Sequence, residues 1–167
     1  YGPLKKTVIM NTQKTIVKQS DIAKRLNISS AAVNDMLKKL AKENLVICHA
    51  YKGVELTKAG FIQGKKLIRN HRLWEVFLHQ VLNMAWDTIH DEAEQLEHAA
   101  SETLMDKIDA YLNHPKVDPH GNPIPDKQGR ITTIKHEKKL LNCKLHTSLT
   151  IIRFTNFDST YLDFLSK

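Results

Sequence analysis

The stretch from Ser20 to Glu43, SDIAKRLNISSAAVNDMLKKLAKE, has the pattern of two short helices joined by a tight turn. Ser20 or Asp21 can cap the first helix, because such side chains accept hydrogen bonds from the N–H groups of a first helical turn. Ser29 or Ser30 can cap the second helix in the same way. Apolar residues recur along the second helix at helical spacing, at Val33, Met36, Leu37 and Leu40. The stretch therefore predicts a helix-turn-helix.

Two β-prone runs follow this motif. They are Leu45–Cys48 and Gly53–Leu56, and the turn Tyr51–Gly53 lies between them, so we expect a hairpin. A hairpin after a helix-turn-helix makes a winged helix, whose second helix enters the major groove of DNA. Small and polar residues at the start of that helix can approach base edges, and lysines suit phosphates. The candidate DNA-binding residues are Ser29, Ser30, Ala32, Asn34, Asp35, Lys38, Lys39 and Lys52. A helical hairpin that binds no nucleic acid is the alternative.

Charge is unevenly distributed along the chain, whose net charge is +7. Residues 1–70 hold 14 Lys and Arg against 4 Asp and Glu, residues 71–126 hold 3 against 11, and residues 127–167 hold 8 against 3. The basic first segment suits a polyanion such as DNA, although a basic segment can also be only a solvated face. The acidic middle segment contains six of the nine histidines, which suits a divalent cation.

Composition excludes several classes of protein. The 167 residues contain no run of about 18 apolar residues, which argues against a membrane span. No charged and apolar leader opens the chain, so we expect no secretory signal. Cys48 and Cys143 are too few for a disulfide framework or a four-thiolate zinc site, and a reducing cytoplasm fits such cysteine usage best. Neither an HExxH motif nor a nucleophile elbow is present, so these hydrolase signatures give no support to an enzyme.

Three further helices are expected in the middle of the chain. A long helix runs from Thr57 to about Leu82, and another runs from a Thr88 cap to about His98. Ser101 caps the third helix. Its apolar residues, which we expect to point inward, are Leu104, Ile108 and Leu112.

Acidic and histidine side chains gather on the first two of these helices. Four residues of the second one fall within an arc of about 100° on a helical wheel, beside its apolar stripe: His90, Glu94, Glu97 and His98. Carboxylates at that edge of the core would repel one another and lose hydration unless a cation joined them. On the preceding long helix, His71 and Glu75 lie four residues apart and share a face. These six residues are the candidate ligands of a transition metal, although each alone could be a partly buried histidine or a solvated glutamate.

Five segments together are typical of one family: Asp21–Leu26, Val54–Gly60, Asn70–Glu75, His90–His98 and Pro119–Pro125. With them, the sequence resembles the diphtheria toxin repressor family of metal-dependent transcriptional regulators, and especially its manganese-responsive members. The resemblance covers roughly residues 17–125. The run that begins at His90, with the later Gly-Asn-Pro-Ile-Pro, is specific to the family, whereas the helix-turn-helix alone would not be.

The resemblance implies two metal sites. The second site would use His71, Glu75 and His90. The primary site would use the other three candidates with a ligand from the first helix, where Asp, Glu or Met is expected. Residues 1–20 contain no acidic residue, and Met10 is the only candidate of that type. Either a residue upstream of Tyr1 supplies this ligand, or the primary site is incomplete.

Glu94 bears on the identity of the metal. Iron-responsive members of the family that the sequence resembles have Cys at this position. A carboxylate is a harder donor than a thiolate, so Glu94 favours manganese over softer ions.

The sequence and the resemblance together predict a mainly α fold with three parts. A winged helix-turn-helix DNA-binding domain covers residues 1–63, and a helical metal-binding and dimerisation domain covers residues 64–125. A linker and a partial SH3-like segment cover residues 126–167, with the resemblance implying that Leu149–Phe154 is a strand and Asp158–Ser166 a short helix of that module. We expect a homodimer, because the middle helices show more apolar surface than a small helical unit can bury alone.

These observations predict a metal-dependent transcriptional repressor rather than an enzyme. It would act in the cytoplasm on double-stranded DNA with a palindromic operator and would control metal-uptake genes. Mn(II) is the expected cofactor, and an Fe(II)-responsive regulator of the same fold is the alternative. Metal would hold the winged helix against the dimerisation helices and so set the spacing of two recognition helices. A dinuclear metallohydrolase that uses the acidic cluster is the alternative from another class, and it would not need the basic winged helix.

Overall fold

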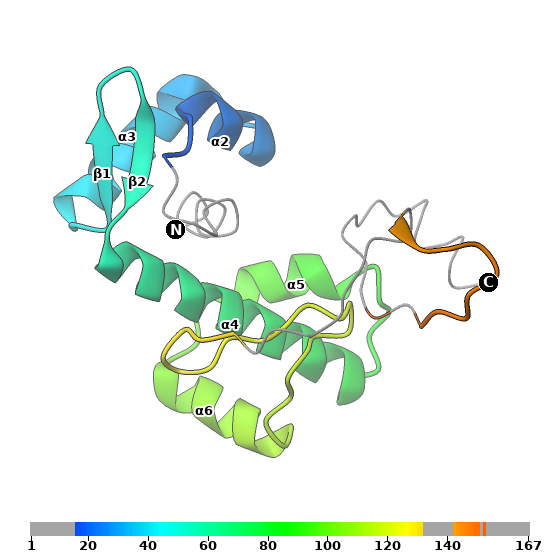
Figure 1. Ribbon diagram of the computed structural model, residues 1–167. Helices are drawn as coiled ribbons and strands as arrows, with labels where there is room; N and C mark the ends of the chain where they lie inside the picture. Colours follow the sequence, from blue (N-terminus) through cyan, green and yellow to red (C-terminus); the bar gives the residue numbers. More distant parts are fainter. Residues whose placement is uncertain (1–15, 132–141, 151, 153–167) are drawn as a thin grey trace. The chain divides into compact units, whose positions relative to one another are not determined.

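The computed structural model describes residues 16–131, 142–150 and 152, and it confirms the predicted mainly α fold (Figure 1). The elements in chain order are α2 (Gln19–Leu26), α3 (Ser30–Lys42), β1 (Val46–His49), β2 (Gly53–Leu56), α4 (Lys58–Gln80), α5 (Ile89–Leu96) and α6 (Glu102–Tyr111). No helix of the described part is long and apolar enough to cross a membrane.

The described residues divide into two compact units. The first unit takes the residues up to Ile68 together with Lys127–Gly129, and the second takes Arg69–Asp126 and the residues after Gly129. Helix α4 therefore contributes to both units. The predicted domain limits at residues 63 and 125 stay predictions. Met10 and most of the predicted SH3-like segment lie outside the described residues.

The helix-turn-helix of the first unit has the predicted side-chain cap at α3 but not at α2. The Oγ atom of Ser29 accepts a hydrogen bond from the backbone N–H of Ala32 at 3.2 Å, which caps α3. Helix α2 begins earlier than expected, since Lys18 is its N-cap residue and makes no side-chain cap. The predicted capping by Ser20 or Asp21 is therefore wrong, because Gln19 already takes helical geometry and leaves both residues inside the helix.

The wing is an antiparallel hairpin of β1 and β2. His49 pairs with Gly53, so the turn covers residues 50–52 and begins one residue earlier than predicted. Gly53 has a φ of 129°, and a Cβ atom there would lie 2.3 Å from the backbone oxygen of Val17. Only glycine allows this approach, which lets Val17 add two backbone hydrogen bonds to Val54 at the edge of the hairpin.

Helices α2, α3 and the start of α4 pack with the wing around one apolar core. Its buried members are Val17, Ile22, Ala23, Val33, Leu37, Leu40, Val46, Val54 and Leu67. This core holds α3 with one face buried and its other face open to solvent.

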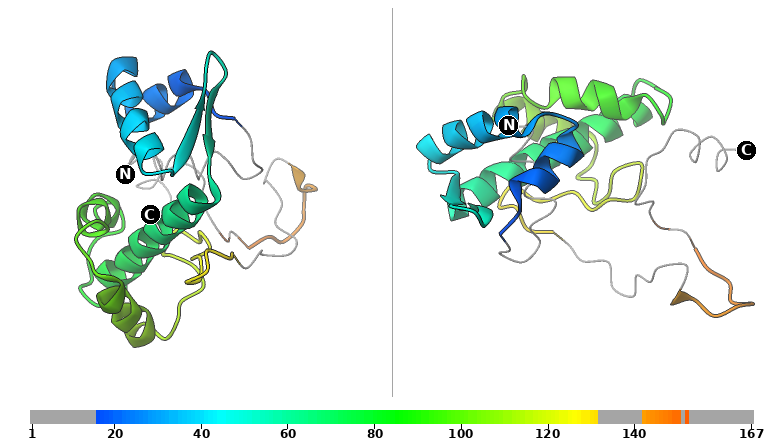
Figure 2. Two further views of the ribbon diagram at one scale, coloured as in Figure 1. Left: turned by 90° about the vertical axis from the view of Figure 1, so that its left-hand side faces the viewer. Right: turned by 90° about the horizontal axis from the view of Figure 1, so that it is seen from above.

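In the second unit, α5 and α6 lie on different sides of α4 (Figures 1 and 2). An α4–α6 cluster consists of Leu73, Val76, Met105, Ile108 and Ile124, and an α4–α5 cluster consists of Leu78, Ile89 and Ala93. Ser101 caps α6 as predicted, since its Oγ atom accepts from the backbone N–H of Leu104 at 3.2 Å. Leu104 itself is 45% exposed, so its predicted inward position is wrong. It lies on the solvent side of α6, while Ile108 packs inward.

Candidate metal centre

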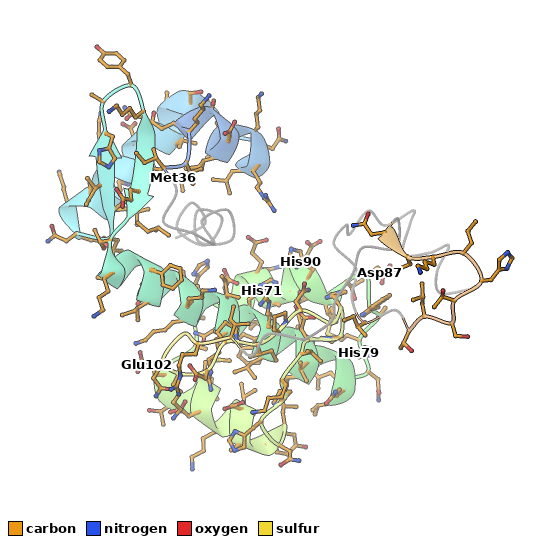
Figure 3. The ribbon with its side chains drawn as sticks, viewed as in Figure 1. Met36, His71, His79, Asp87, His90 and Glu102 are labelled. Carbon is orange, nitrogen blue, oxygen red and sulfur yellow. The ribbon has the colours of Figure 1, made fainter. Side chains whose placement is uncertain are left out.

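His71 and Glu75 on α4 and His90 on α5 form a compact triad. Figure 3 labels two of its members, His71 and His90. The Nε2 atom of His71 lies 3.0 Å from Oε1 of Glu75 and 3.0 Å from Nδ1 of His90. The Nδ1 atom of His90 also lies 3.0 Å from Oε1 of Glu75. His71 and Glu75 are buried, and His90 is about half exposed. Four-residue spacing on α4 sets the first pair, and the α4–α5 cluster brings His90 beside it.

The three ligand atoms of this triad form a triangle with sides of 3.0 Å. Hydrogen bonds alone do not account for such a triangle. An imidazole N–H points in one direction in the ring plane, so it aligns well with only one partner. A six-coordinate ion with bonds of about 2.1 Å places neighbouring ligand atoms about 3.0 Å apart. The donor set and its spacing therefore fit a divalent cation.

Glu97 adds a second buried carboxylate to the triad. Its Oε2 atom lies 2.7 Å from Nδ1 of His71, so both ring nitrogens of His71 face a carboxylate. Its Oε1 atom lies 3.2 Å from Nε2 of His98, which is 41% exposed. Glu97 is the C-cap residue of α5, and its backbone N–H still donates to the carbonyl of Ala93, so Glu97 lies one helical turn after that buried residue and is itself buried.

Asp118 and His120 bring a further set of ligand atoms to Glu75. One atom from each of these three buried side chains lies within 4.8 Å of the others. The Nδ1 atom of His120 is 3.8 Å from Oε2 of Glu75. The carboxylate of Glu75 therefore turns Oε1 toward His71 and His90 and Oε2 toward His120. We call Glu75, Asp118 and His120 the second triad.

The loop that carries the second triad is organised around Asp118. Its Oδ1 atom accepts hydrogen bonds from the backbone N–H groups of His120 at 2.9 Å and Asn122 at 2.8 Å. The side-chain amide of Asn122 donates to Oδ2 at 3.0 Å, and Nε of Arg72 lies 3.5 Å from the same oxygen. Gly121 takes the left-handed backbone conformation, with a φ of 83°.

Asp118 and His120 are not among the metal ligands that the sequence predicts. Both lie in a loop, where no helical period relates them to Glu75. The available signal was an acidic residue and a histidine two positions apart inside the Pro119–Pro125 region that carries the resemblance.

The two buried carboxylates of the second triad differ in their tendency to ionise. Burial raises the pKa of Glu75, but the neighbouring imidazoles of His120, His71 and His90 outweigh burial and lower the pKa far below its ordinary value. Burial raises the pKa of Asp118, and the nearby charge of Glu75 raises it further. Hydrogen bonds from Asn122 and the charge of Arg72 oppose this rise. Two carboxylates at this depth favour a cation between them.

Glu94 is the one predicted ligand that the described residues do not bring into this cluster. It lies on the exposed side of α5, whereas Glu97 is buried. The five other candidates, His71, Glu75, His90, Glu97 and His98, form a continuous chain of contacts. The roles of all six as metal ligands stay predictions.

The candidate DNA-binding residues lie on the surface of the first unit. Ser29, Ser30, Asp35, Lys38, Lys39 and Lys52 are exposed, and Ala32 and Asn34 are half-buried. The other side of α3 is buried through Val33, Leu37 and Leu40. The helix therefore has one face free for a partner, and DNA contact by these residues stays a prediction.

Two family models match the sequence, one describing a DNA-binding domain and one describing a metal-binding and dimerisation domain. Residues 6–54 match the N-terminal DNA-binding domain of iron-dependent repressors. Residues 57–126 match the metal-binding and dimerisation domain of iron-dependent repressors. The candidate DNA-binding residues lie in the first match, and both sets of candidate metal ligands lie in the second.

Individual proteins show the same relationship. The chain is 34% identical over 104 residues to the iron-dependent repressor IdeR of Mycobacterium tuberculosis, which covers 62% of this chain and 45% of that protein. It is 34% identical over 96 residues to the transcriptional regulator MntR of Bacillus pumilus, which covers 58% of this chain and 66% of that protein. The chain thus spans less than half the length of the mycobacterial repressor.

A solved structure described as a manganese-dependent transcriptional repressor in complex with manganese superimposes with a TM-score of 0.86. The two sequences are 34% identical, and the match covers 99% of this chain and 77% of that one. The two matched models, IdeR and this solved structure are all described as repressors, which favours the predicted repressor over the metallohydrolase alternative. The helix-turn-helix, the buried histidine–carboxylate cluster and these matches lead to one conclusion: the chain belongs to the iron-dependent repressor family of metal-dependent transcriptional repressors.

Proposed function

We propose that this chain is a Mn(II)-responsive repressor that binds a palindromic operator as a homodimer and controls metal-uptake genes. Action on DNA would place it in the cytoplasm. The observation that carries the proposal is the triangle of His71, Glu75 and His90, with the carboxylate of Glu97 beside it. Nitrogen and hard oxygen donors without a thiolate suit Mn(II) better than softer ions.

The residues of the centre would hold a cation by joining three segments of the second unit. His71 and Glu75 belong to α4, His90 lies in the first turn of α5, and Asp118 and His120 belong to the later loop. When bound, the cation would neutralise the negative charge of the buried carboxylates. The side chains would fix the ends of these segments relative to one another, and the population would shift toward the form that binds DNA.

A metal-dependent DNA-binding measurement tests the proposal. Duplexes are first selected from a randomised pool with the wild-type chain and Mn(II), and binding is then followed by fluorescence anisotropy with and without the metal. We expect Glu75→Gln to weaken Mn(II) binding at least about tenfold and to abolish the metal-dependent gain in DNA binding. Glu92→Gln is the matched control, because Glu92 is an exposed glutamate on α5. Metal-independent DNA binding by the wild type, or an unaffected Glu75→Gln chain, would overturn the proposal.

An Fe(II)-responsive repressor is the second candidate, because the mycobacterial relative is named an iron-dependent repressor. Anaerobic titration of the same DNA-binding reaction with Fe(II) and with Mn(II) separates the two candidates. A response at lower free Fe(II) than free Mn(II) would favour this alternative.

A further inference from the structure

Trp86 lies in the loop between α4 and α5, where it contacts the metal centre from a side that the proposed ligands do not use. The indole is partly buried and packs against the α4–α5 cluster of Leu78, Ile89 and Ala93. It also stacks on the imidazole of His120, with ring centroids 5.2 Å apart and ring planes inclined by 20°. Trp86 therefore links the start of α5 to the loop that carries the second triad.

The loop around Trp86 is held at both ends by hydrogen bonds. The backbone N–H of Met84 donates to the carbonyl of Leu78 at 3.0 Å, which fixes the loop to the end of α4. The backbone N–H of Ile89 and the hydroxyl of Thr88 donate to the carbonyl of Ala85, which fixes it to the start of α5. The indole is thus a firm support for a neighbouring ring.

Stacking restrains His120 without competing for its nitrogen atoms. The indole covers the face of the imidazole, whereas the lone pair that binds a metal lies in the plane of the ring. The side chain of His120 is 3% exposed, and its Nδ1 atom is directed to within 3.8 Å of Oε2 of Glu75. An electron-rich indole face also stabilises an imidazole that has given up electron density to a cation.

We propose that Trp86 is a positioning residue for His120, which holds the imidazole ready for a divalent cation at the second triad. The stacked contact and the burial of His120 carry this inference. It rests on the proposed function, because it requires a cation at the cluster of Glu75, Asp118 and His120.

Removal of the aromatic ring tests the proposal on the full chain. Mn(II) binding is measured as free Mn(II) by electron paramagnetic resonance for the wild type and for Trp86→Leu. Leucine keeps apolar contact with the α4–α5 cluster but cannot stack on His120. We expect the affinity for one bound Mn(II) to fall by at least about tenfold, as for other groups that orient a metal ligand. Trp86→Phe keeps a stacking ring and should retain most of the affinity.

Leu78→Val is the matched control, since it disturbs the same apolar cluster and keeps the indole that stacks on His120. If Leu78→Val weakens Mn(II) binding as much as Trp86→Leu does, the effect is one of packing and the positioning role is overturned. Far-UV circular dichroism compares the fold of each variant. If Trp86→Leu does not fold, the Mn(II) affinities of Trp86→Phe and Trp86→Tyr are compared with that of the wild type. Both variants keep a stacking ring, so an equal loss of Mn(II) affinity in the two would also overturn the role.

A fluorescence measurement tests whether the indole of Trp86 senses a cation that His120 binds. The chain has two tryptophans, so Trp74→Phe leaves Trp86 as the single indole. We expect Mn(II) to change its emission, and we expect His120→Ala in the same background to abolish that change. Emission that responds equally with and without His120 would overturn the proposal.

The outcomes separate this proposal from the proposed function. If Trp86→Leu binds Mn(II) as the wild type does while Glu75→Gln does not, the positioning role fails and the proposed function stands. If the wild-type chain binds no Mn(II), the proposed function fails, and the role of Trp86 fails with it.

Discussion

Glu75 is the residue on which the candidate metal centre depends. Its Oε1 atom faces His71 and His90, and its Oε2 atom faces His120, so one carboxylate belongs to both triads. Its pKa lies far below the ordinary value because the three neighbouring imidazoles outweigh its burial. The ionised form is therefore built into the folded state.

The lowered pKa of Glu75 predicts how stability depends on pH in the metal-free chain. The unfolded state binds a proton near the ordinary value of 4.5 and the folded state does so only at a much lower pH. Ionised Glu75 therefore contributes stability above that value, and the contribution is lost as pH falls below it. Thermal unfolding in EDTA between about pH 5.5 and pH 3.5 should show a shallower pH dependence for Glu75→Gln than for the wild type. Equal slopes, with Glu92→Gln as reference, would contradict this expectation.

The side chain at position 94 is expected to affect which metal activates DNA binding. A thiolate at this position is a softer donor than the native carboxylate, so Glu94→Cys should shift activation of DNA binding from Mn(II) toward Fe(II). Anisotropy titrations with each metal measure the shift. Glu92→Cys adds the same thiol to an exposed position of α5 and should leave the order of metals unchanged. An unchanged order in Glu94→Cys would remove Glu94 from the ligand set.

At the scale of elements, close packing constrains the positions of α3 and α4. Helix α3 buries Val33, Leu37 and Leu40 and exposes the opposite face. Helix α4 packs its first turn against Leu45, the residue before β1, where Gly60 allows close approach. These two contacts determine how the recognition helix and the wing are presented.

The exposed lysines of α3 should contact phosphates without reading sequence. We expect Lys39→Ala to weaken binding to all duplexes and to lower the slope of log K against log salt by about one. Asn34→Ala should instead change which duplexes are selected, because Asn34 lies near the start of the helix, where base edges are read. Lys107→Ala is the charge control, because it removes an exposed lysine of α6. Equal salt slopes for Lys39→Ala and Lys107→Ala would remove α3 from the DNA interface.

Gly60 predicts a large loss of stability on substitution. A Cβ atom there would lie 1.8 Å from the backbone oxygen of Leu45, so Gly60→Ala forces the backbone of α4 or of the preceding segment to move. We expect a loss of at least about 2 kcal/mol in the free energy of unfolding, measured by urea denaturation. Gly64→Ala, one helical turn away in α4, is the comparison variant, because alanine favours a helix over glycine. A loss in Gly60→Ala no larger than that in Gly64→Ala would contradict the role of the contact.

At the scale of the whole molecule, the proposed function requires two copies of the chain. Leu104 and Tyr111 are exposed on α6, at 45% and 70%, while Ile108 between them is buried in the α4–α6 cluster. The apolar surface predicted for dimerisation is therefore smaller than the sequence indicated, because Ile89 and Ile108 pack within one chain.

Leu104 remains the residue of α6 at which a charge tests the dimer. Leu104→Asp should give a monomer by analytical ultracentrifugation at micromolar concentration, because a charge buried in a two-fold apolar patch has no partner. Ile47→Asp adds the same charge to an exposed position of the wing and should leave the dimer intact. A wild-type monomer, or a dimeric Leu104→Asp chain, would contradict the predicted interface.

The sequence by itself determined the features that depend on short-range geometry. Ser29 as a cap, the helix-turn-helix, the hairpin and the pairing of His71 with Glu75 follow from the periods of helices and strands and from capping chemistry. The acidic and histidine residues of α5 also pointed to the metal centre.

Only the tertiary structure decided which of those side chains meet. Glu97 is buried against His71, because it lies one helical turn after buried Ala93, whereas Glu94 is exposed, although the helical wheel places both within one arc. Asp118, His120 and Trp86 join the centre from loops, and a loop has no period from which its contacts can be derived. Their positions follow from hydrogen bonds and apolar packing between distant segments, which form only when α4, α5 and the later loop are packed together.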